Sequence, residues 1–436
     1  MNIEVTVRIE GREVAVVKAD LLTQSELVLE EQTERLKDRI GQTILEVGFQ
    51  EIARQLRRPC CCGRRMENKG VRRVNVMSQS GEVVLQRHRY RCRVCGEWQT
   101  PADAIICCGN HRITRRLAKQ ICQLATVEHF TRLEQLLADQ HGVHLGHEPM
   151  LRLVHDVGTA AEQERLQQAD RWLQTPACER TWPAPEIFPQ RLYVSCDGIM
   201  YCTNQTEPDP QNSGKPRLIW KQMRVGCVYW QDGRGCWHKR VIWGQEDDLL
   251  SFGAALYLLA CRCGYREADE KIFAADGGEW CWSIHEQYFA DAAGVLDWYH
   301  ASEHVWTCGK ALSPEDAAAW SDEALERLSD QGGEGLLAWL LPQRPRLRGR
   351  KRAALDHLIR YVQPRLHRTD YPAYRHRGWQ IGTGMVESTA KQLVALRLKG
   401  PGMHWCARGA TAVTALRAQD LNERWHTFWN HLTLAT

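Results

Sequence analysis

The chain has 436 residues, of which 43% are hydrophobic and 25% are charged, and its formal net charge is +4. This length allows two to four domains with a sizeable core, and the ordinary composition excludes a fibrous protein and argues against long disordered tails. The longest apolar run, Phe252 to Ala260, is too short to span a bilayer, and the charged first residues offer no signal-peptide core. We therefore expect an intracellular, soluble protein with no membrane partner.

The first segment, residues 1–57, begins with a strand-like stretch and continues into a long helix. Apolar residues recur at helical spacing from Glu26 to Arg57. The apolar stripe of this helix pairs with a second chain or packs within its own chain, and the sequence favours neither alternative. Residues 1–57 are therefore a candidate dimerisation segment.

A zinc-ribbon-like hairpin is predicted within residues 58–110. Two short strands, Arg72 to Met77 and Val83 to Arg91, flank a Ser80-Gly81 turn, and their pairing brings a Cys-Cys-Cys-Gly run close to a Cys-x-x-Cys-Gly run. Four thiolates around one point suit a tetrahedral structural Zn²⁺, whereas most of the 18 cysteines should be free thiols. The zinc ligands that we expect are Cys60, Cys62, Cys92 and Cys95.

A helical region is predicted over residues 111–175. Thr131 to Gln140, a turn at Gly142 to Gly146, and Pro149 to Val157 resemble a helix-turn-helix, whose second helix would present Arg152 or His155 to the bases of a major groove. Such helical hairpins also occur in proteins that bind no nucleic acid. Nearby, Arg115 and Arg116 belong to a basic cluster that would bind DNA phosphates or simply face solvent.

A proline-rich linker, residues 176–190, precedes a new α/β domain whose first part covers residues 191–310. Three strands, a helix, a strand, a helix and a strand follow one another, which is the element order of the ribonuclease-H-like fold with its mixed sheet. The predicted strands are Arg191 to Cys202, Leu218 to Tyr229, Gly235 to Trp243, Lys271 to Ala275 and Gly294 to Leu296, and the predicted helices are Leu249 to Cys261 and Ser283 to Ala290.

Three acidic residues occupy informative places in this domain. Asp197 lies in the first strand, Asp276 ends the fourth, and Glu387 lies on a later helix with a buried face. Strand ends are where sites are usually built, and carboxylates crowded together repel one another unless cations bind between them. Two Mg²⁺ ions about 4 Å apart stabilise the attacking and leaving oxygens of a phosphodiester. The alternative for each residue is an ordinary acid that faces water.

The residues also carry a family resemblance from about Cys60 to the end of the chain. Ile381 to Ser388 and Arg397 to Trp405 are its most specific stretches, with Val194 to Gly198 and Ala275 to His300 in support. The chain resembles the ISKra-type insertion-sequence transposases, members of the DDE superfamily with a ribonuclease-H-like catalytic domain. This resemblance implies a multidomain α/β protein, and it implies a catalytic triad of Asp197, Asp276 and Glu387 that binds Mg²⁺ or Mn²⁺.

The same resemblance points to Asp297 and His300, which match a signature that follows the second acid in related transposases. His300 would orient a catalytic group or contact the scissile phosphate, and Asp297 is the alternative second metal ligand. A purely structural role, with Asp297 capping a helix and His300 satisfied by a hydrogen bond, is an equal alternative.

A helical insertion is expected at residues 311–369, because 86 residues (387 − 300 − 1) separate His300 from Glu387. Glu315 to Leu341 should be helical with a break at Gly332-Gly333, and Leu355 to Val362 should form another helix. The insertion would carry DNA-contacting residues, as would the rest of the catalytic domain at residues 370–436. The predicted contacts are Arg346, Arg348, Arg350, Lys351, Arg352, Arg397 and Lys399.

Together these features predict a transposase that cleaves DNA and joins it to a target. It would bind double-stranded terminal inverted repeats through the zinc-ribbon-like and helix-turn-helix-like regions. We expect a homodimer or higher oligomer in the cytoplasm of a prokaryote, associated with the nucleoid. Two alternatives are a DNA-binding regulator that keeps the fold without catalysis and a nuclease of the same fold that cleaves without strand transfer.

Overall fold

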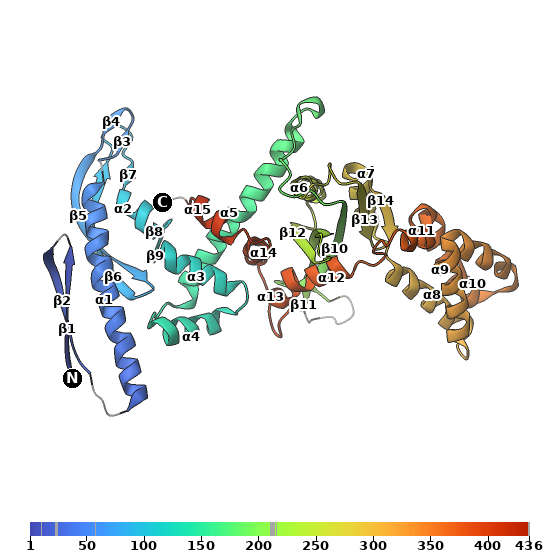
Figure 1. The fold of residues 1–436 in the computed structure, drawn as a ribbon, viewed down its shortest axis with the longest axis horizontal. Coiled ribbons are helices and arrows are strands. Elements are labelled where there is room, and N and C mark those ends of the chain that lie inside the picture. The colour runs from blue at the N-terminus through green and yellow to red at the C-terminus, as the bar shows by residue number, and fades with distance from the viewer. Residues whose placement is uncertain (10, 22–24, 57, 210–213, 215, 435–436) are drawn as a thin grey trace. The chain divides into compact units, whose positions relative to one another are not determined.

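The computed structural model describes the chain except for residues 10, 22–24, 57, 210–213, 215 and 435–436 (Figure 1). The chain divides into two compact units, which are described separately. The first comprises Met1–Glu162, Thr411–Asp420 and Arg424–Thr436, and the second comprises Gln163–Ala410 and Leu421–Glu423. Across the described parts of the chain, no helix has both the length and the apolar character that crossing a membrane requires.

The first unit begins with an antiparallel ribbon and the long helix predicted for this region. Strands β1 (Asn2–Ile9) and β2 (Arg12–Asp20) pair, and α1 (Glu26–Gln55) starts at Ser25, whose side chain accepts a hydrogen bond from the Val28 N–H. Arg57, the predicted end of the helix, lies outside the described residues. Leu45 and Phe49 of α1 pack against the core of the following hairpin. This part of the apolar stripe therefore packs within its own chain.

The predicted hairpin is confirmed. Strands β5 (Glu67–Ser78) and β6 (Gly81–Arg91) pair with Ser78 opposite Gly81, and Gly81 has the left-handed φ of 97° that the turn requires. Short elements surround the hairpin in a sheet of order β7-β6-β5-β9-β8. The short strands of this sheet are β7 (Trp98–Gln99), β8 (Cys107–Cys108) and β9 (His111–Thr114), with helix α2 (Pro101–Ile106) between β7 and β8, whereas β3 (Cys60–Cys61) and β4 (Arg64–Arg65) form a separate two-stranded ribbon.

The predicted helix-turn-helix elements are present, with a longer second helix. After α3 (Arg115–Ala125), α4 (Phe130–His141) ends at Gly142, whose φ of 59° reverses the chain, and α5 runs from His147 to Gln174. Part of the C-terminal tail joins this unit, although the sequence suggested that the whole tail belongs to the catalytic domain. Gly158 of α5 explains the association, because a Cβ there would lie 2.4 Å from the carbonyl oxygen of Ala412. The tail helices are α14 (Ala407–Leu421) and α15 (Trp425–His431).

The second unit contains a mixed five-stranded sheet of order β12-β11-β10-β13-β14. Strands β10, β11 and β12 are antiparallel neighbours, and β13 and β14 run parallel to β10. Every predicted strand and helix of this region is present. The elements are η1 (Ala177–Glu179), β10 (Arg191–Pro208), β11 (Pro216–Gln231), β12 (Trp237–Gln245), α6 (Leu249–Arg262), β13 (Glu270–Ala275), α7 (Glu279–Tyr288) and β14 (Ala293–Leu296). Strand β10 extends to Pro208 and β11 begins at Pro216, beyond the predicted ends at Cys202 and Leu218, and residues 210–213 and 215 between them lie outside the described residues.

A helical insertion follows the sheet, as predicted. Its long helix α9 is interrupted at Gly332, whose φ of 68° and approach to the Thr369 carbonyl exclude a side chain. The elements are α8 (Trp298–Leu312), α9 (Ala317–Leu340), η2 (Leu341–Arg346), α10 (Gly349–Val362), η3 (Gln363–Arg368) and α11 (Tyr371–His376). The chain then returns to the sheet through α12 (Gly384–Ala390), a π-helical turn η4 (Lys391–Ala395) and α13 (Leu396–Leu398).

Candidate active site and zinc site

Two of the predicted catalytic acids lie where adjacent strands separate. The parallel pairing of β10 with β13 ends at Ser195 opposite Ala274, and Asp197 and Asp276 each follow two residues later. Strand β13 ends at Ala275, whereas β10 continues beside β11. The carboxylates therefore extend from matching positions at the ends of the paired segments of two neighbouring strands.

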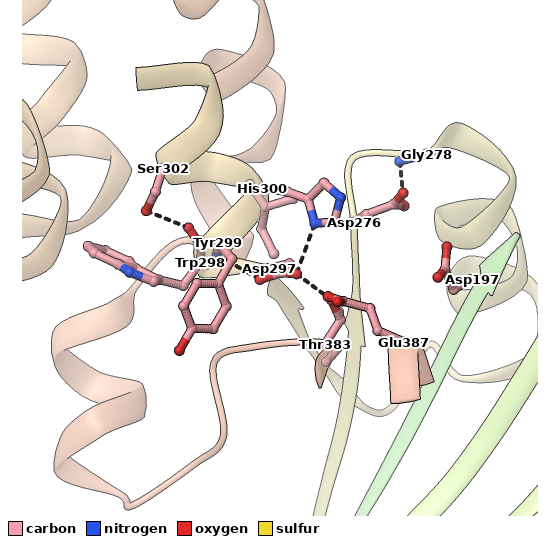
Figure 2. Close-up of polar contacts among 12 residues, drawn as sticks. Asp197, Asp276, Gly278, Asp297, Trp298, Tyr299, His300, Ser302, Thr383 and Glu387 are labelled. Carbon is pink, nitrogen blue, oxygen red and sulfur yellow. Dashed lines mark hydrogen bonds and ion pairs between the residues drawn. The ribbon is translucent and has the colours of Figure 1, made fainter. Parts of the chain in front are cut away.

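Helix α12 brings the third predicted acid to the same place. The hydroxyl of Thr383, the residue before α12, lies 3.1 Å from Oε1 of Glu387 and forms a short hydrogen bond to Oδ2 of Asp297 (Figure 2). Thr383 is buried and joins two elements that are 86 residues apart in sequence. The sequence analysis did not select Thr383, although a threonine at a helix start four residues before the acid is a usable signal.

Asp297 and His300 form a hydrogen-bonded pair. Asp297 is fully buried, caps α8 by accepting from the Tyr299 N–H at 2.7 Å, and lies 2.9 Å from Nδ1 of His300. Burial acts to raise the pKa of Asp297, but the hydrogen bonds from His300, Thr383 and Tyr299 hold it below its ordinary value. The Asp297 carboxylate raises the pKa of His300 to about 9, so the imidazole is protonated at neutral pH.

The predicted triad is crowded with negative charge. Burial, followed by the charges of Asp276 and Glu387, raises the pKa of Asp197 to about 6, against the opposing influence of the Gly198 N–H and His300. Asp197 and Asp276 each accept one backbone N–H bond through Oδ1, at 2.7 and 2.9 Å. Within the described residues, one carboxylate oxygen of each triad member has no hydrogen-bond partner, whereas both oxygens of Asp297 are engaged.

This arrangement fits a divalent cation. Unpaired carboxylate oxygens in a partly desolvated cluster are the donor set that Mg²⁺ and Mn²⁺ prefer, and a bound cation removes the repulsion that raises the pKa of Asp197. Among the described residues, the acidic group whose ligand atoms all lie within 4.8 Å of one another comprises Asp297, His300 and Glu387, and it does not include Asp197 or Asp276. Asp297 and His300 already hydrogen-bond each other, with 2.9 Å between Oδ2 and Nδ1.

A second group of ligands lies at the end of the β5–β6 hairpin in the first unit. Cys61, Cys62, Cys92 and Cys95 each offer a sulfur, and all four sulfurs lie within 4.8 Å of one another. The Cys61 sulfur is 3.8 Å from that of Cys62 and 3.4 Å from that of Cys95. A tetrahedral zinc with bonds of about 2.3 Å separates its sulfurs by about 3.8 Å, so this four-cysteine group can bind Zn²⁺.

The ligand set differs from the predicted one in a single position, because Cys61 replaces Cys60. In the β3–β4 ribbon, Cys60 pairs with Arg65 and Cys61 with Arg64, so neighbouring side chains point to opposite faces. Cys62 then adopts a φ of 50° and Gly63 a φ of 72°, which turns the chain back within two residues. Adjacent cysteines can therefore both face the metal. The Cys-Gly turn was the sequence signal for this geometry.

The predicted DNA-contacting residues fall into two groups. Arg116, Arg152, Arg346, Arg348, Arg350, Lys351 and Lys399 are exposed. The second group is partly or fully buried: Arg115 donates to the carbonyl oxygens of Trp429 and Leu432, and Arg352 pairs with Asp356 at 3.1 Å. Arg397 is only 2% exposed, with its guanidinium 4.8 Å from the ring centre of Trp405. This corrects the prediction, since Arg397 is a buried packing residue.

Replacing Arg397 with alanine should destabilise the second unit by about 2 kcal/mol or more, because a buried cation–π contact and packed side-chain atoms are lost. Lys399→Ala, two residues later at an exposed position, should leave stability unchanged. Denaturant titrations measure the first effect, and DNA-binding titrations at fixed salt compare the two variants. Weaker DNA binding by Arg397→Ala with full stability would restore the contact that the sequence suggested.

Comparison with known proteins gives limited similarity. No protein-family model matches the chain, and no curated protein matches it. Among solved structures, it is similar to a chain of the Drosophila P element transposase strand transfer complex. The two are 9% identical with a TM-score of 0.34, and the similarity covers 72% of this chain and 93% of that chain. The resemblance to ISKra-type transposases therefore stays a prediction from the sequence.

Proposed function

We propose that the protein is a metal-dependent DNA transposase of the DDE type, with Asp197, Asp276 and Glu387 as metal ligands. The observation that carries this proposal is that Asp276 and Glu387 lie near enough to Asp197 for their charges to raise its pKa, and that each of the three carboxylates keeps an oxygen without a hydrogen-bond partner among the described residues. The sheet order β12-β11-β10-β13-β14, with three antiparallel strands followed by two parallel ones, supports a ribonuclease-H-like catalytic domain of the kind found in ISKra-type enzymes.

The surrounding residues have distinct roles in this proposal. Two bound Mg²⁺ or Mn²⁺ ions would stabilise the attacking and leaving oxygens of the phosphodiester. Asp297 and Thr383 fix His300 and Glu387 by hydrogen bonds. The protonated imidazole of His300 supplies a positive charge and a donor for a phosphate oxygen, because its Nε2 has no partner within the described chain. Both strand cleavage and strand transfer would use this one site.

DNA binding is proposed for the first unit as well as for the exposed basic residues of the second. The zinc-ribbon-like hairpin and the pair α4–α5 would recognise the terminal inverted repeats, and the exposed Arg152 of α5 would exchange its 3.0 Å pairing with Glu148 for a base or a phosphate. Joining two element ends in one complex requires a homodimer or higher oligomer. A cytoplasmic, nucleoid-associated prokaryotic protein is the setting that this function implies.

An assay with labelled element ends and Mg²⁺ tests the proposal. We expect wild type to cleave the ends and join them to target DNA. Asp276→Ala and Glu387→Ala should each lose more than about a hundredfold in rate, because metal ions supply several kcal/mol of transition-state stabilisation. Glu279→Ala, an exposed acid on α7, is the matched control and should retain activity.

The other outcomes distinguish the alternatives. Wild type that binds the ends without cleaving them favours a DNA-binding regulator, and cleavage without joining favours a nuclease. If both alanine variants remain active, the carboxylates have been assigned wrongly.

A further inference from the structure

The helical insertion contacts the turn that follows Asp276. Arg365 of η3 donates from Nη2 to the carbonyl oxygen of Gly277 at 2.8 Å, and from Nη1 to the carbonyl oxygen of Tyr361 at 2.7 Å. One guanidinium thus ties the insertion to the residue directly after a proposed metal ligand. Figure 1 shows α8 to α11 grouped beside the β13–β14 edge of the sheet.

The Tyr361 ring of the insertion leaves no room for a side chain at Gly277. A Cβ at this position would lie 2.6 Å from Cε2 of Tyr361 and 3.1 Å from its hydroxyl oxygen, which is closer than real Cβ atoms approach ring carbons. The φ of Gly277 lies outside the left-handed region, so its backbone alone does not require glycine. The aromatic ring of Tyr361 is therefore the reason that only glycine fits here.

The Tyr361 ring is held on two sides. It stacks on the His304 ring with a centroid separation of 3.7 Å and an interplanar angle of 26°, and the Arg365 guanidinium lies 4.7 Å from its centre. His304 lies one helical turn after His300 on α8. Helix α8, the Tyr361 and Arg365 side chains and the turn after Asp276 therefore pack against one another.

Two polar groups in this assembly are buried at a cost. The Tyr361 hydroxyl and Nε of Arg365 have no hydrogen-bond partner among the described residues. An unsatisfied buried donor costs about 1 to 3 kcal/mol, and phenylalanine at position 361 would keep the ring stack without that cost.

We propose that the insertion is part of the metal site, with Arg365 and Tyr361 as positioning residues that set Asp276 by holding the Asp276-Gly277-Gly278 turn. This inference rests on the proposed function, since it assigns a role toward the same metal ions. Partners that orient a ligating group change metal affinity by about 10- to 100-fold when they are replaced. The insertion would therefore set the metal affinity of the site as well as carrying basic residues.

The test measures Mn²⁺ binding to the full chain without DNA, by electron paramagnetic resonance, together with the Mg²⁺ dependence of cleavage. Arg365→Lys keeps the charge but loses the two-carbonyl geometry, and Gly277→Ala displaces the Tyr361 ring. Each should weaken Mn²⁺ binding by about 10- to 100-fold. Each should also raise the Mg²⁺ concentration for half-maximal cleavage, with DNA affinity unchanged.

Matched controls make the same chemical changes elsewhere in the second unit. Arg327→Lys alters an arginine of α9 that pairs with Glu323 at 3.5 Å, and Gly233→Ala fills a position with no atom within 4 Å of its Cβ. Neither should change Mn²⁺ affinity. The double variant Gly277→Ala/Arg365→Lys should bind Mn²⁺ no more weakly than the worse single variant, because both act on one turn.

The outcomes separate this inference from the proposed function. Unchanged Mn²⁺ affinity in both variants, with wild type active, overturns the positioning role and leaves the transposase proposal intact. If both variants bind Mn²⁺ more weakly than wild type but wild type never cleaves DNA, the positioning role is supported and the proposed transposase activity is overturned. Wild type that binds no Mn²⁺ overturns both.

Discussion

Replacing Asp197 with asparagine is expected to stabilise the metal-free protein at pH 7.5 while abolishing DNA cleavage. Burial and the charges of Asp276 and Glu387 raise the folded-state pKa of Asp197 to about 6, above its ordinary value of 3.8. The folded wild type therefore binds this proton more tightly than the unfolded chain does. Protonation of Asp197 therefore stabilises the folded state. This contribution to the free energy of unfolding is complete below about pH 4 and is lost as the pH rises through 6. Asparagine keeps the acceptor for the Gly198 N–H without the charge.

The stability gained by Asp197→Asn can be estimated from the raised pKa of Asp197. Two pKa units correspond to at most about 3 kcal/mol, and partial solvent access reduces this to about 1 to 2 kcal/mol. The unfolding transition of the second unit should rise by about 2 to 6 °C at pH 7.5, and the difference from wild type should shrink toward pH 4.5. Differential scanning calorimetry at both pH values measures it. Mg²⁺ should stabilise wild type and have little effect on the variant.

Glu279→Gln is the control for this experiment, because it neutralises an exposed acid on α7. It should change neither the melting temperature nor the response to Mg²⁺. An Asp197→Asn protein that melts below wild type at pH 7.5 would contradict the crowding of carboxylates, and a variant that still cleaves would remove Asp197 from the metal site.

Replacing Cys61 with alanine is expected to remove one zinc ion per chain, whereas Cys60→Ala should keep it. The Cys61 sulfur lies at zinc-ligand spacing from those of Cys62 and Cys95, and Cys60 lies outside the four-cysteine group. Structural zinc contributes about 10 kcal/mol or more to folding of small sites, so its loss should unfold the Cys end of the hairpin. Metal analysis by mass spectrometry gives the stoichiometry, and hydrogen exchange over β5 and β6 reports the unfolding.

The adjacent pair makes this a matched comparison, since both variants remove one thiol from the same two-residue strand. Zinc lost from Cys60→Ala and retained in Cys61→Ala would restore the ligand set that the sequence favoured. A wild-type protein that is purified without zinc, and that does not take it up, would contradict the site altogether.

Local patterns accounted for most of the elements. The β5–β6 hairpin was predictable because alternating side chains and a Ser-Gly turn specify pairing and register within a short stretch. The break in α9 at Gly332 was predictable because glycine accepts a φ that other residues avoid. Asp197 and Asp276 could be assigned to strands and Glu387 to a helix from local patterns, but family resemblance was needed to select all three from other surface acids.

Contacts between distant segments were not predictable from local patterns. Arg397 reads as a surface cation in sequence, and only the fold places it over Trp405. Part of the tail joined the first unit because a glycine on α5 admits the backbone of Ala412. Such contacts depend on how separate elements pack against each other. The hydrophobic periodicity of one element does not predict which other element it will contact.

The three carboxylates and the four-cysteine group also separate what local sequence patterns predict from what only the tertiary structure shows. By itself, the sequence determined the strand that carries Asp197, the strand that ends just before Asp276, the two cysteine runs at one end of a hairpin, and the existence of a helical insertion. The tertiary structure alone decided that Cys61 faces the other sulfurs, that Thr383 joins Asp297 to Glu387, and that Arg365 reaches Gly277. The physical reason is that side-chain direction at a turn and contacts across 86 or more residues follow from the packed fold.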